Sequence, residues 1–311
     1  SFTCRARKPK ITNVEFFETS KDALLNGYRP CKVCTPMSPL GEVPDWMKKL
    51  MALVQKSDDL RIKDYQIREL GIDSNRVRRW FKKNHNMTFQ GYLRSLRIGR
   101  SHGHLVEGKK VIDTAFMSGH ESLSGFGSSY KKITKSAPSK AKEIISTYKI
   151  PTPLGPMMAA SVKEGICLLE FTDRRMLEKQ IKIIEKKFDA PLVTNESKHI
   201  KLLKKQLNEY FKGTRLEFSV PICAPGTEFQ EKVWQLLLKI PYGQTSTYMK
   251  QAKRLKSPKA IRAVANANGM NRIAILIPCH RVIGTDGSLT GYAGGIWRKQ
   301  KLLELESQFS K

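Results

Sequence analysis

The chain has 311 residues, of which 40% are apolar, and its 56 Lys and Arg against 28 Asp and Glu give a net charge of +28. This length exceeds what one hydrophobic core usually holds, and the apolar residues are spread along it, so several folded domains are expected and extensive disorder is excluded. No apolar run approaches the roughly 20 residues that cross a bilayer, which favours a soluble, intracellular protein with no membrane partner.

Basic residues gather in two windows of the sequence. Residues 74–110 hold ten Lys or Arg and one Glu, and residues 241–303 hold eleven Lys or Arg and one Asp. Because acidic residues nearly vanish from both windows, we expect two separate surfaces for a polyanion, of which DNA or RNA is the commonest.

The first 36 residues are basic and contain three cysteines, Cys4, Cys31 and Cys34. Cysteine is a soft metal ligand, and a structural zinc site takes four ligands, so one is missing from this set. The six cysteines of the whole chain are too few for a disulfide framework and indicate a reducing compartment. Neither a Met nor an apolar leader begins the sequence, and we expect that it is cut at its start.

A proline-rich linker is predicted near 36–43, and from there to about 145 the apolar residues recur at helical spacing. Residues 61–74 predict a helix, a turn at Gly71 and a new helix capped by Asp73 or Ser74. The next helix, 75–83, is expected to read DNA through three of its basic residues, Arg76, Arg78 and Arg79.

A second helix-turn-helix pattern follows at 111–132, although Gly125 and Gly127 weaken its second helix. A solvated face is the usual explanation of one basic helix, but two such patterns at this separation make it the less favoured one. The pair resembles the tandem helix-turn-helix domain of AraC-type regulators.

A second break at 134–155 precedes a further domain that we expect to begin near 150. A strand is predicted at 165–171 and a helix at 176–188, which together indicate a small α/β unit. After residue 225 the pattern becomes helical again, and the DNA-facing part is expected there.

Cys279 is the candidate nucleophile, because it is followed directly by His280 and Arg281. A cysteine attacks as thiolate and needs a nearby base or positive charge. Neighbouring side chains of an extended segment point to opposite sides, so His280 reaches the thiol only through a turn or a bridging water. A buried structural cysteine is the alternative for this pair taken alone.

The sequence of 271–284, with the glycine and tyrosine residues at 287–295 and the helix that ends in Glu306, resembles the active-site region of the O6-alkylguanine-DNA alkyltransferases. The resemblance implies one irreversible transfer of an alkyl group from O6 of guanine, and also from O4-methylthymine, to Cys279. It further implies that His280, a water molecule and Glu306 activate the thiol.

The same resemblance assigns further roles. It implies that Tyr248 protonates the leaving base, that Arg262 beside Ala263 enters the base stack, and that Asn271 braces the active-site backbone. Tyr292 lies in the loop that closes over the base, where Ala293 replaces the hydroxyl residue of some relatives. No glycine fingerprint for S-adenosylmethionine is found, so the methyl group is expected to come from DNA.

Residues 16–34 resemble the N-terminal domain of the Ada family, in which four cysteines bind zinc and the first accepts a methyl group from DNA phosphotriesters. In that alignment Cys4 is the second cysteine, and the first would directly precede Ser1. The resemblance implies zinc bound by Cys4, Cys31 and Cys34 in the intact protein. For this chain, weak zinc binding with water as fourth ligand and no metal at all both remain open.

The order of these modules resembles the bifunctional Ada family, an alkyltransferase fused to an AraC-type regulator, along nearly the whole chain. The predicted fold is multidomain α+β. It comprises a zinc domain at 1–42, an all-α tandem helix-turn-helix domain at 43–149, an α/β subdomain at 150–225 and a helical, winged-helix-like catalytic domain at 226–311.

The expected partners are double-stranded DNA at alkylated and promoter sites, and RNA polymerase, for a monomer in the bacterial cytoplasm associated with the nucleoid. Two alternatives from other classes are a transcription regulator with an inactive transferase domain and a cysteine-dependent hydrolase. Methyl transfer to Cys279 would distinguish both from a repair protein.

Overall fold

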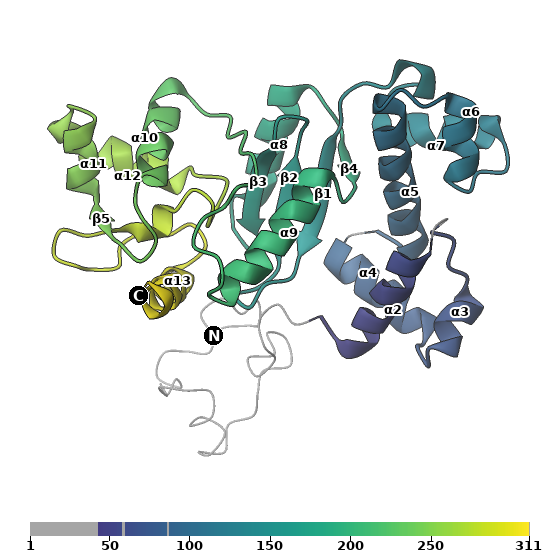
Figure 1. Ribbon diagram of the computed structural model, residues 1–311, viewed down its shortest axis with the longest axis horizontal. Helices are drawn as coiled ribbons and strands as arrows, with labels where there is room; N and C mark the ends of the chain where they lie inside the picture. The colour runs from purple at the N-terminus through teal and green to yellow at the C-terminus, as the bar shows by residue number, and fades with distance from the viewer. Residues whose placement is uncertain (1–42, 58–59, 86, 311) are drawn as a thin grey trace, which may run out of the picture.

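The computed structural model describes residues 43–57, 60–85 and 87–310. The predicted zinc domain at 1–42, with Cys4, Cys31 and Cys34, and most of the predicted linker lie outside these described residues. The described chain forms a helical domain, a four-stranded sheet with helices, and a second group of helices, seen from right to left in Figure 1.

In its described residues, the helical domain contains six α-helices. They are α2 (Asp45–Lys56), α3 (Asp64–Glu69), α4 (Ser74–His85), α5 (Phe89–Val106), α6 (Val111–Met117) and α7 (Leu123–Thr134). One apolar core joins α2, α3, α4 and the first half of α5, and a separate one joins the second half of α5 to α6 and α7. The long helix α5 therefore connects two helix-turn-helix units.

The turn before α4 forms where the sequence predicted it. Gly71 adopts a φ of +71°, which a glycine adopts without steric cost. The carboxylate of Asp73 then accepts hydrogen bonds from the backbone amides of Asn75 and Arg76 at 2.6 and 3.0 Å, so Asp73 rather than Ser74 caps the helix.

The second unit forms a regular helix in spite of its glycines. The Ser122 hydroxyl accepts a hydrogen bond from the Gly125 amide, and α7 continues through Gly127 to Thr134. The N-terminal cap and the burial of Phe126 offset the poor helix propensity of the two glycines.

The sheet consists of β1 (Ile145–Ile150), β2 (Met157–Ser161), β3 (Ile166–Phe171) and β4 (Leu192–Thr194) in the order β3-β2-β1-β4. The β1–β2 and β2–β3 pairs are antiparallel, and β1 and β4 are parallel. Helix α8 (Leu177–Phe188) covers one face, and α9 (Lys198–Phe211) covers the other (Figure 1). The central part of the chain is thus a mixed helix and strand unit.

The sheet begins with β1 at Ile145, ahead of the position near 150 where we expected this domain to start. The prolines at 151, 153 and 156 follow β1 and lie in its connection to β2, so they mark a turn inside the sheet.

The last part of the chain packs further helices against the α9 face of the sheet. They are α10 (Glu228–Leu238), α11 (Tyr248–Arg254), α12 (Ile261–Gly269) and α13 (Ile296–Phe309), with the short strands β5 (Ser246–Thr247) and β6 (Val282–Ile283) and the 3-10 turns η3 (Pro258–Ala260) and η4 (Cys279–Arg281). One apolar core is continuous from the sheet through α9 into these helices. A further 3-10 turn, η2 (Pro138–Lys140), lies between α7 and β1.

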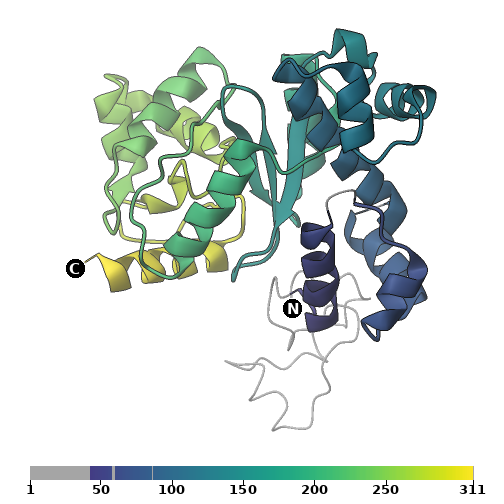
Figure 2. The same ribbon diagram turned by 45° about the vertical axis from the view of Figure 1, so that its right-hand side comes forward.

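The helical domain lies against the sheet rather than apart from it. Helix α5 packs on β4, where the Thr194 amide donates a hydrogen bond to the Ser95 hydroxyl at 3.1 Å, and Lys149 of β1 donates to the Asn84 carbonyl. Figure 2 shows α5 beside the edge of the sheet. Among the described residues no helix is both long and apolar enough to cross a membrane.

Candidate active site

A cavity of about 430 Å³ opens where the sheet unit meets the last group of helices. Its wall combines the loop after β3, helices α11 and α12, the turn η4 and the loop before α13. Residues from each of these elements line it, namely Arg174, Tyr248, Asn268, Cys279, Thr290 and Tyr292. Three candidate residues from distant parts of the sequence, Tyr248, Cys279 and Tyr292, are therefore brought to one cavity.

The segment before Cys279 is fixed to the edge of the sheet. The Leu169 amide of β3 donates a hydrogen bond to the Arg272 carbonyl, and the Ala274 amide donates to the Leu169 carbonyl, both at 2.8 Å. This ladder extends the sheet by a short strand-like piece, so the catalytic loop starts from rigid structure.

The chain then makes an unusual turn at Ile275, which has a φ of +72° and is buried. The Leu276 amide donates to the Ala274 carbonyl at 2.9 Å across it, which closes a three-residue γ-turn. A positive φ at a β-branched residue is strained by roughly 1–3 kcal/mol, and such strain persists only where the surroundings enforce it. The strained turn directs the chain toward Cys279.

Asn271 holds the Cys279 sulfur. Its side-chain amide donates to Sγ at 3.1 Å and to the Ile277 carbonyl at 2.8 Å, while its side-chain oxygen accepts from the Ile273 amide at 3.0 Å. All polar atoms of this buried amide group are thus used, and they fix both the loop and the sulfur. Burial raises the pKa of the Cys279 thiol to about 11, although the hydrogen bond from Asn271 lowers it.

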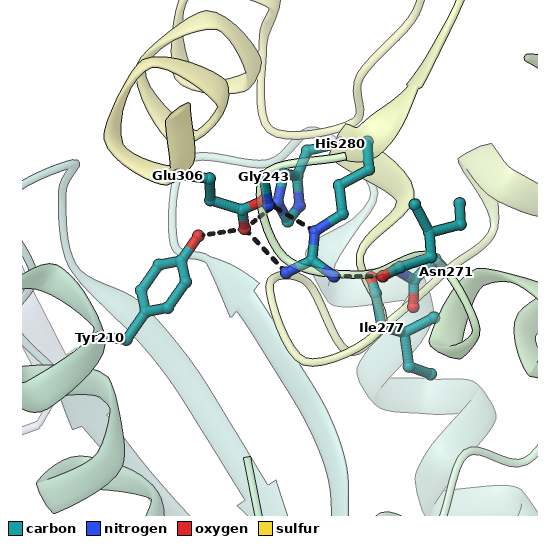
Figure 3. Close-up of polar contacts among 8 residues, drawn as sticks. Tyr210, Gly243, Asn271, Ile277, His280 and Glu306 are labelled. Atoms are coloured by element: carbon teal, nitrogen blue, oxygen red, sulfur yellow. Dashed lines mark hydrogen bonds and ion pairs between the residues drawn. The ribbon is translucent and has the colours of Figure 1, made fainter. Parts of the chain in front are cut away.

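Close to the catalytic turn, the buried carboxylate of Glu306 takes part in five hydrogen bonds, and Figure 3 shows its surroundings. Arg281 donates through Nε and Nη2 at 2.8 and 3.0 Å, the Tyr210 hydroxyl donates at 2.8 Å, and the Gly243 amide donates at 3.3 Å. His280 Nε2 lies 2.9 Å from the same group. Burial raises the pKa of Glu306, but His280 and Arg281 outweigh it and lower the pKa to about 2.

This arrangement determines the tautomer of His280. Because the Glu306 carboxylate is ionised and only accepts hydrogen bonds, the proton of the neutral imidazole lies on Nε2. Burial lowers the pKa of His280, so the ring is neutral at pH 7. Nδ1 then carries a lone pair, and this buried atom has no hydrogen-bond partner among the described residues. His280 is therefore arranged as a base.

The two candidate tyrosines both line the cavity. Burial raises the pKa of Tyr248 above its usual value, while a hydrogen bond with Thr290 lowers it, so the phenol remains protonated at pH 7. Burial also raises the pKa of Tyr292, whose hydroxyl is buried without a hydrogen-bond partner in the described structure. The ring of Tyr292 contacts His280 edge to face, with 6.5 Å between the ring centroids.

Arg262 and Ala263 lie apart from the thiol, on the exposed face of α12. The buried side of this helix is held by Val264 and by Asn268, whose amide donates to Gln251 at 2.9 Å. The exposed face is free to approach a ligand that the cavity would take up from outside.

The predicted DNA-reading arginines of α4 are exposed and lie in the other domain. Arg76 lies over the ring of Trp46 at 4.6 Å, Arg78 pairs with Asp64 at 3.2 Å, and Arg79 donates to a backbone carbonyl of its own helix at 3.4 Å. These surface contacts are weak and leave the guanidinium groups available.

Sequence reasoning missed several residues of the site. Arg281 and Tyr210 bind Glu306, and the buried Lys299 donates to the carbonyls of Val282 and Thr290, where burial lowers its pKa to about 8. Tyr210 gave no signal, because its helical spacing is that of any core residue. Arg281 was noticed as a positive charge beside Cys279, but its partner is Glu306.

A second missed feature is the ion pair between Arg174 and Glu170, both almost fully buried. Here the sequence held a signal, since a carboxylate in an otherwise apolar strand requires a partner. Among residues 43–57, 60–85 and 87–310 no group of three or more His, Cys, Asp or Glu could hold a metal ion.

Four stretches of the chain match known protein families. Residues 145–224 match the ribonuclease-like domain and residues 228–308 the DNA-binding domain of 6-O-methylguanine DNA methyltransferase. Residues 67–143 match a helix-turn-helix domain, and residues 1–37 match the metal-binding domain of Ada. With the cysteine site described above, these matches define the class: a 6-O-methylguanine DNA methyltransferase preceded by a helix-turn-helix domain and a metal-binding domain.

Individual relatives narrow this class. The chain is 30% identical to the bifunctional transcriptional activator/DNA repair enzyme Ada of Escherichia coli over 98% of its own length and 88% of that protein. It is 57% identical to a methylated-DNA–protein-cysteine methyltransferase of Mycobacterium tuberculosis over 32% of this chain and 61% of that protein. The crystal structure of the Mycobacterium tuberculosis O6-methylguanine methyltransferase aligns with a TM-score of 0.46 and 41% identity, covering 54% of this chain and 96% of that one. The chain belongs to the Ada family.

Proposed function

We propose that this protein repairs DNA by transferring a methyl or other small alkyl group from O6 of guanine, and from O4 of thymine, to its own Cys279. It is thus a methylated-DNA–[protein]-cysteine S-methyltransferase that also regulates transcription. The observation that carries this proposal is the Cys279 sulfur held by Asn271 in the cavity wall, with the His280–Glu306 pair behind it.

The chemistry is one displacement at carbon. The sulfur of Cys279 forms a bond to the alkyl carbon as the bond from that carbon to O6 breaks, and the electron pair of the broken bond stays on the base. The thiol proton passes to Nδ1 of His280, directly or through a water molecule, and the resulting imidazolium is stabilised by Glu306. Proton removal and transfer must be coupled, because burial holds the thiol in its protonated form at pH 7.

The leaving base must gain a proton, and Tyr248 supplies it; afterwards the phenolate takes a proton from solvent and the imidazolium of His280 releases one. Its phenol lines the same cavity as Cys279 and is protonated at pH 7. The product is a thioether, which has no thiolate left to react. Each protein molecule therefore repairs one lesion, and no S-adenosylmethionine takes part.

Base extrusion precedes the chemistry, because O6 cannot be reached inside the duplex. Arg262 and Ala263 lie on the exposed face of α12, from which the arginine enters the base stack, while Tyr292 contributes to the wall around the extruded base. The small side chain of Ala263 lets the helix approach the DNA backbone closely.

Transcription control belongs to the helix-turn-helix domain, with Arg76, Arg78 and Arg79 of α4 in contact with a promoter and RNA polymerase as the partner. Methylation of the N-terminal cysteine domain would remove thiolate charge and ease its approach to phosphates. Zinc bound by Cys4, Cys31 and Cys34 would hold that domain folded. We propose a monomer that acts on the DNA of the bacterial cytoplasm and associates with the nucleoid.

The domain division that we propose is 1–42, 43–149, 150–225 and 226–311, with β1 of the sheet supplied from the end of the second segment. In this division the α/β subdomain supports a helical, winged-helix-like catalytic domain.

The test is incubation with a duplex that contains one O6-methylguanine, followed by intact mass measurement and peptide mapping. One methyl increment on Cys279 is expected, with none in Cys279→Ser. Cys223→Ser serves as the matched control, because Cys223 is a second free cysteine and lies away from the cavity. Hydrolysis of the substrate, or a folded protein without an adduct, would support a cysteine hydrolase or a regulator with an inactive transferase domain instead.

A further inference from the structure

A buried ion pair reaches the cavity of the proposed nucleophile, since its arginine lines the same wall as Cys279, and it takes no part in the steps derived above. Glu170 comes from β3, which is buried along its whole length, and Arg174 comes from the loop that follows. Their side chains are 2% and 3% exposed, and the Arg174 guanidinium donates to the Glu170 carboxylate. A pair so deeply buried costs desolvation energy, which a purely apolar pair would not.

The guanidinium of Arg174 makes two more hydrogen bonds, and both lead to the active site. Nη1 donates to the Asn271 carbonyl and Nη2 to the Gly269 carbonyl, each at 2.8 Å. Gly269 is the last residue of α12, and Asn271 is the residue whose amide holds the Cys279 sulfur. One side chain therefore joins the end of the helix that carries Arg262 to the group that holds the sulfur.

The position of this cation also suits the helix. The C-terminal end of an α-helix carries a partial negative charge, and a buried cation on its last carbonyl groups is favourable. A lysine could not replace Arg174 fully, because only the planar guanidinium reaches two carbonyls and a carboxylate at once.

The pair also sets the charge around the thiol. The charge of Glu170 raises the pKa of Cys279, and the charges of Arg174 and Lys299 lower it. Tyr248 of α11 and Tyr292 are also titratable groups near the thiol, and their own pKa values respond to Cys279. His280, the proposed proton acceptor, is a further one, and burial lowers its pKa.

Glu170 is itself unusual. Burial raises its pKa to about 7, although Arg174 lowers it, and one of its oxygens has no hydrogen-bond partner among the described residues. The charge of Arg298 also lowers the pKa of Glu170. The charge of Arg174 lowers the pKa of Arg272, which lies nearby.

We propose that Arg174, anchored by Glu170, is a positioning residue for the transfer reaction: it fixes the carbonyls of Gly269 and Asn271 so that the Asn271 amide stays on the Cys279 sulfur. Its positive charge stabilises the thiolate as it forms, and the charge of Glu170 opposes this. The inference rests on the proposed function of Cys279.

The experiment measures the single-turnover rate of methyl transfer from an O6-methylguanine duplex between pH 6 and pH 10 for the full chain and four variants. Arg174→Gln is expected to lower the transfer rate at pH 7.5 on the order of tenfold. The pH at which the rate increases should shift upward by about one unit. Glu170→Gln keeps an oxygen that accepts from Arg174 but removes the negative charge, so it moves the rise to lower pH. Arg174→Lys restores part of the rate.

Arg215→Gln is the control for the loss of an ion pair, because the 2.6 Å contact of Arg215 with Glu209 joins partly exposed side chains outside the cavity. Its pH profile is expected to match that of the unmodified chain. Unfolding temperatures are measured in parallel, and they fall for any variant that loses a buried ion pair, whatever its role.

Opposite shifts of the pH profile in the two charge variants support the proposal, because a merely structural pair lowers stability without moving the profile in opposite directions. If Arg174→Gln does not fold, the shift in Glu170→Gln decides alone. Superimposable profiles for Glu170→Gln and the unmodified chain overturn the inference. Failure of the proposed function is a different result, namely no methylation of Cys279 in the unmodified chain.

Discussion

The cavity around Cys279 and the exposed face of α4 are both proposed to meet DNA, yet they are built in opposite ways. Around Cys279 the polar groups are buried and hold one another, with five hydrogen bonds on Glu306 alone. On α4 the arginines are exposed, and Arg78 makes only a surface contact with Asp64.

The difference follows from what each region has to do. A group transfer needs the sulfur, the base and the proton donor within a few tenths of an ångström of their working places, which requires a prearranged buried network. A surface that reads DNA gains from side chains that adjust to phosphates and base edges. Substitutions should therefore act strongly and together in the first region, and weakly and independently in the second.

The largest effect is expected for Glu306→Gln. This change leaves the buried Arg281 without a counter-charge and removes the group that fixes the tautomer of His280. The free energy of unfolding should fall by roughly 3–5 kcal/mol, and the transfer rate by about 100-fold or more. Urea unfolding and single-turnover kinetics measure the two effects. Glu304→Gln, on the exposed side of the same helix, is the control and should change neither.

The second effect is a pH dependence with opposite signs for two buried carboxylates. The pKa of Glu306 is about 2 in the folded chain, below its ordinary value of 4.5, so its stabilising contribution is present above pH 4.5 and is lost as the pH falls toward 2. The pKa of Glu170 is about 7, above the same ordinary value, so its contribution is complete below pH 4.5 and is lost as the pH rises through 7.

Urea unfolding at a series of pH values checks both signs. In Glu306→Gln, the free energy of unfolding should depend less on pH at acidic pH. In Glu170→Gln, it should depend less on pH between pH 5 and pH 8. If each variant instead lost the pH dependence expected for the other, the assignment of the lowered pKa to Glu306 and of the raised pKa to Glu170 would be wrong.

A smaller effect is expected at Ile275, where the γ-turn stores strain. Glycine usually destabilises relative to alanine by roughly 0.5–1 kcal/mol, but a positive φ reverses this preference. Ile275→Gly and Ile275→Ala both lose the buried side chain, so their difference isolates the backbone. We expect the glycine variant to be the more stable of the two by about 1 kcal/mol in urea unfolding. If Ile275→Ala were instead the more stable variant, the turn at Ile275 would be unstrained.

The smallest effect on the fold is expected for Arg79→Ala. Its guanidinium is exposed and contacts only a carbonyl of its own helix, so stability should change by less than about 0.5 kcal/mol and methyl transfer to Cys279 should not change. Affinity for duplex DNA should fall, and the salt dependence of binding should become shallower by about one phosphate contact. Fluorescence titrations at several salt concentrations measure both the affinity and its salt dependence. An unchanged salt dependence would show that Arg79 does not contact a DNA phosphate.

The two regions also differ in how far the sequence predicted them. Helical spacing and the cap at Asp73 sufficed for the first helix-turn-helix unit, because its order comes from neighbours in the sequence. The strand β3 was predicted because it is buried on both faces and is therefore apolar at every position except Glu170. The short strand β4, with three residues, has no periodicity that could reveal it.

For the candidate site, the nucleophile and its immediate neighbours could be inferred from one contiguous motif. The network that holds them could not. Tyr210 lies 96 residues from Glu306 in the sequence, and Arg174 lies 97 residues from Asn271, so only the folded chain brings these partners together. The sequence shows which charged and polar residues are present, but it does not show which buried atoms they contact.

The contact between α5 and β4 has a consequence for how the chain can be divided. A strand at the border of a sheet offers unpaired amides and carbonyls to which another polypeptide can add, and proteins shield such borders. Here the border at β4 is shielded by α5, and the border at β3 by residues 221–223 and 272–274. We expect that residues 145–311, prepared alone, would expose the β4 edge of the sheet and associate through it. The helical domain would then also prevent self-association of the repair domain.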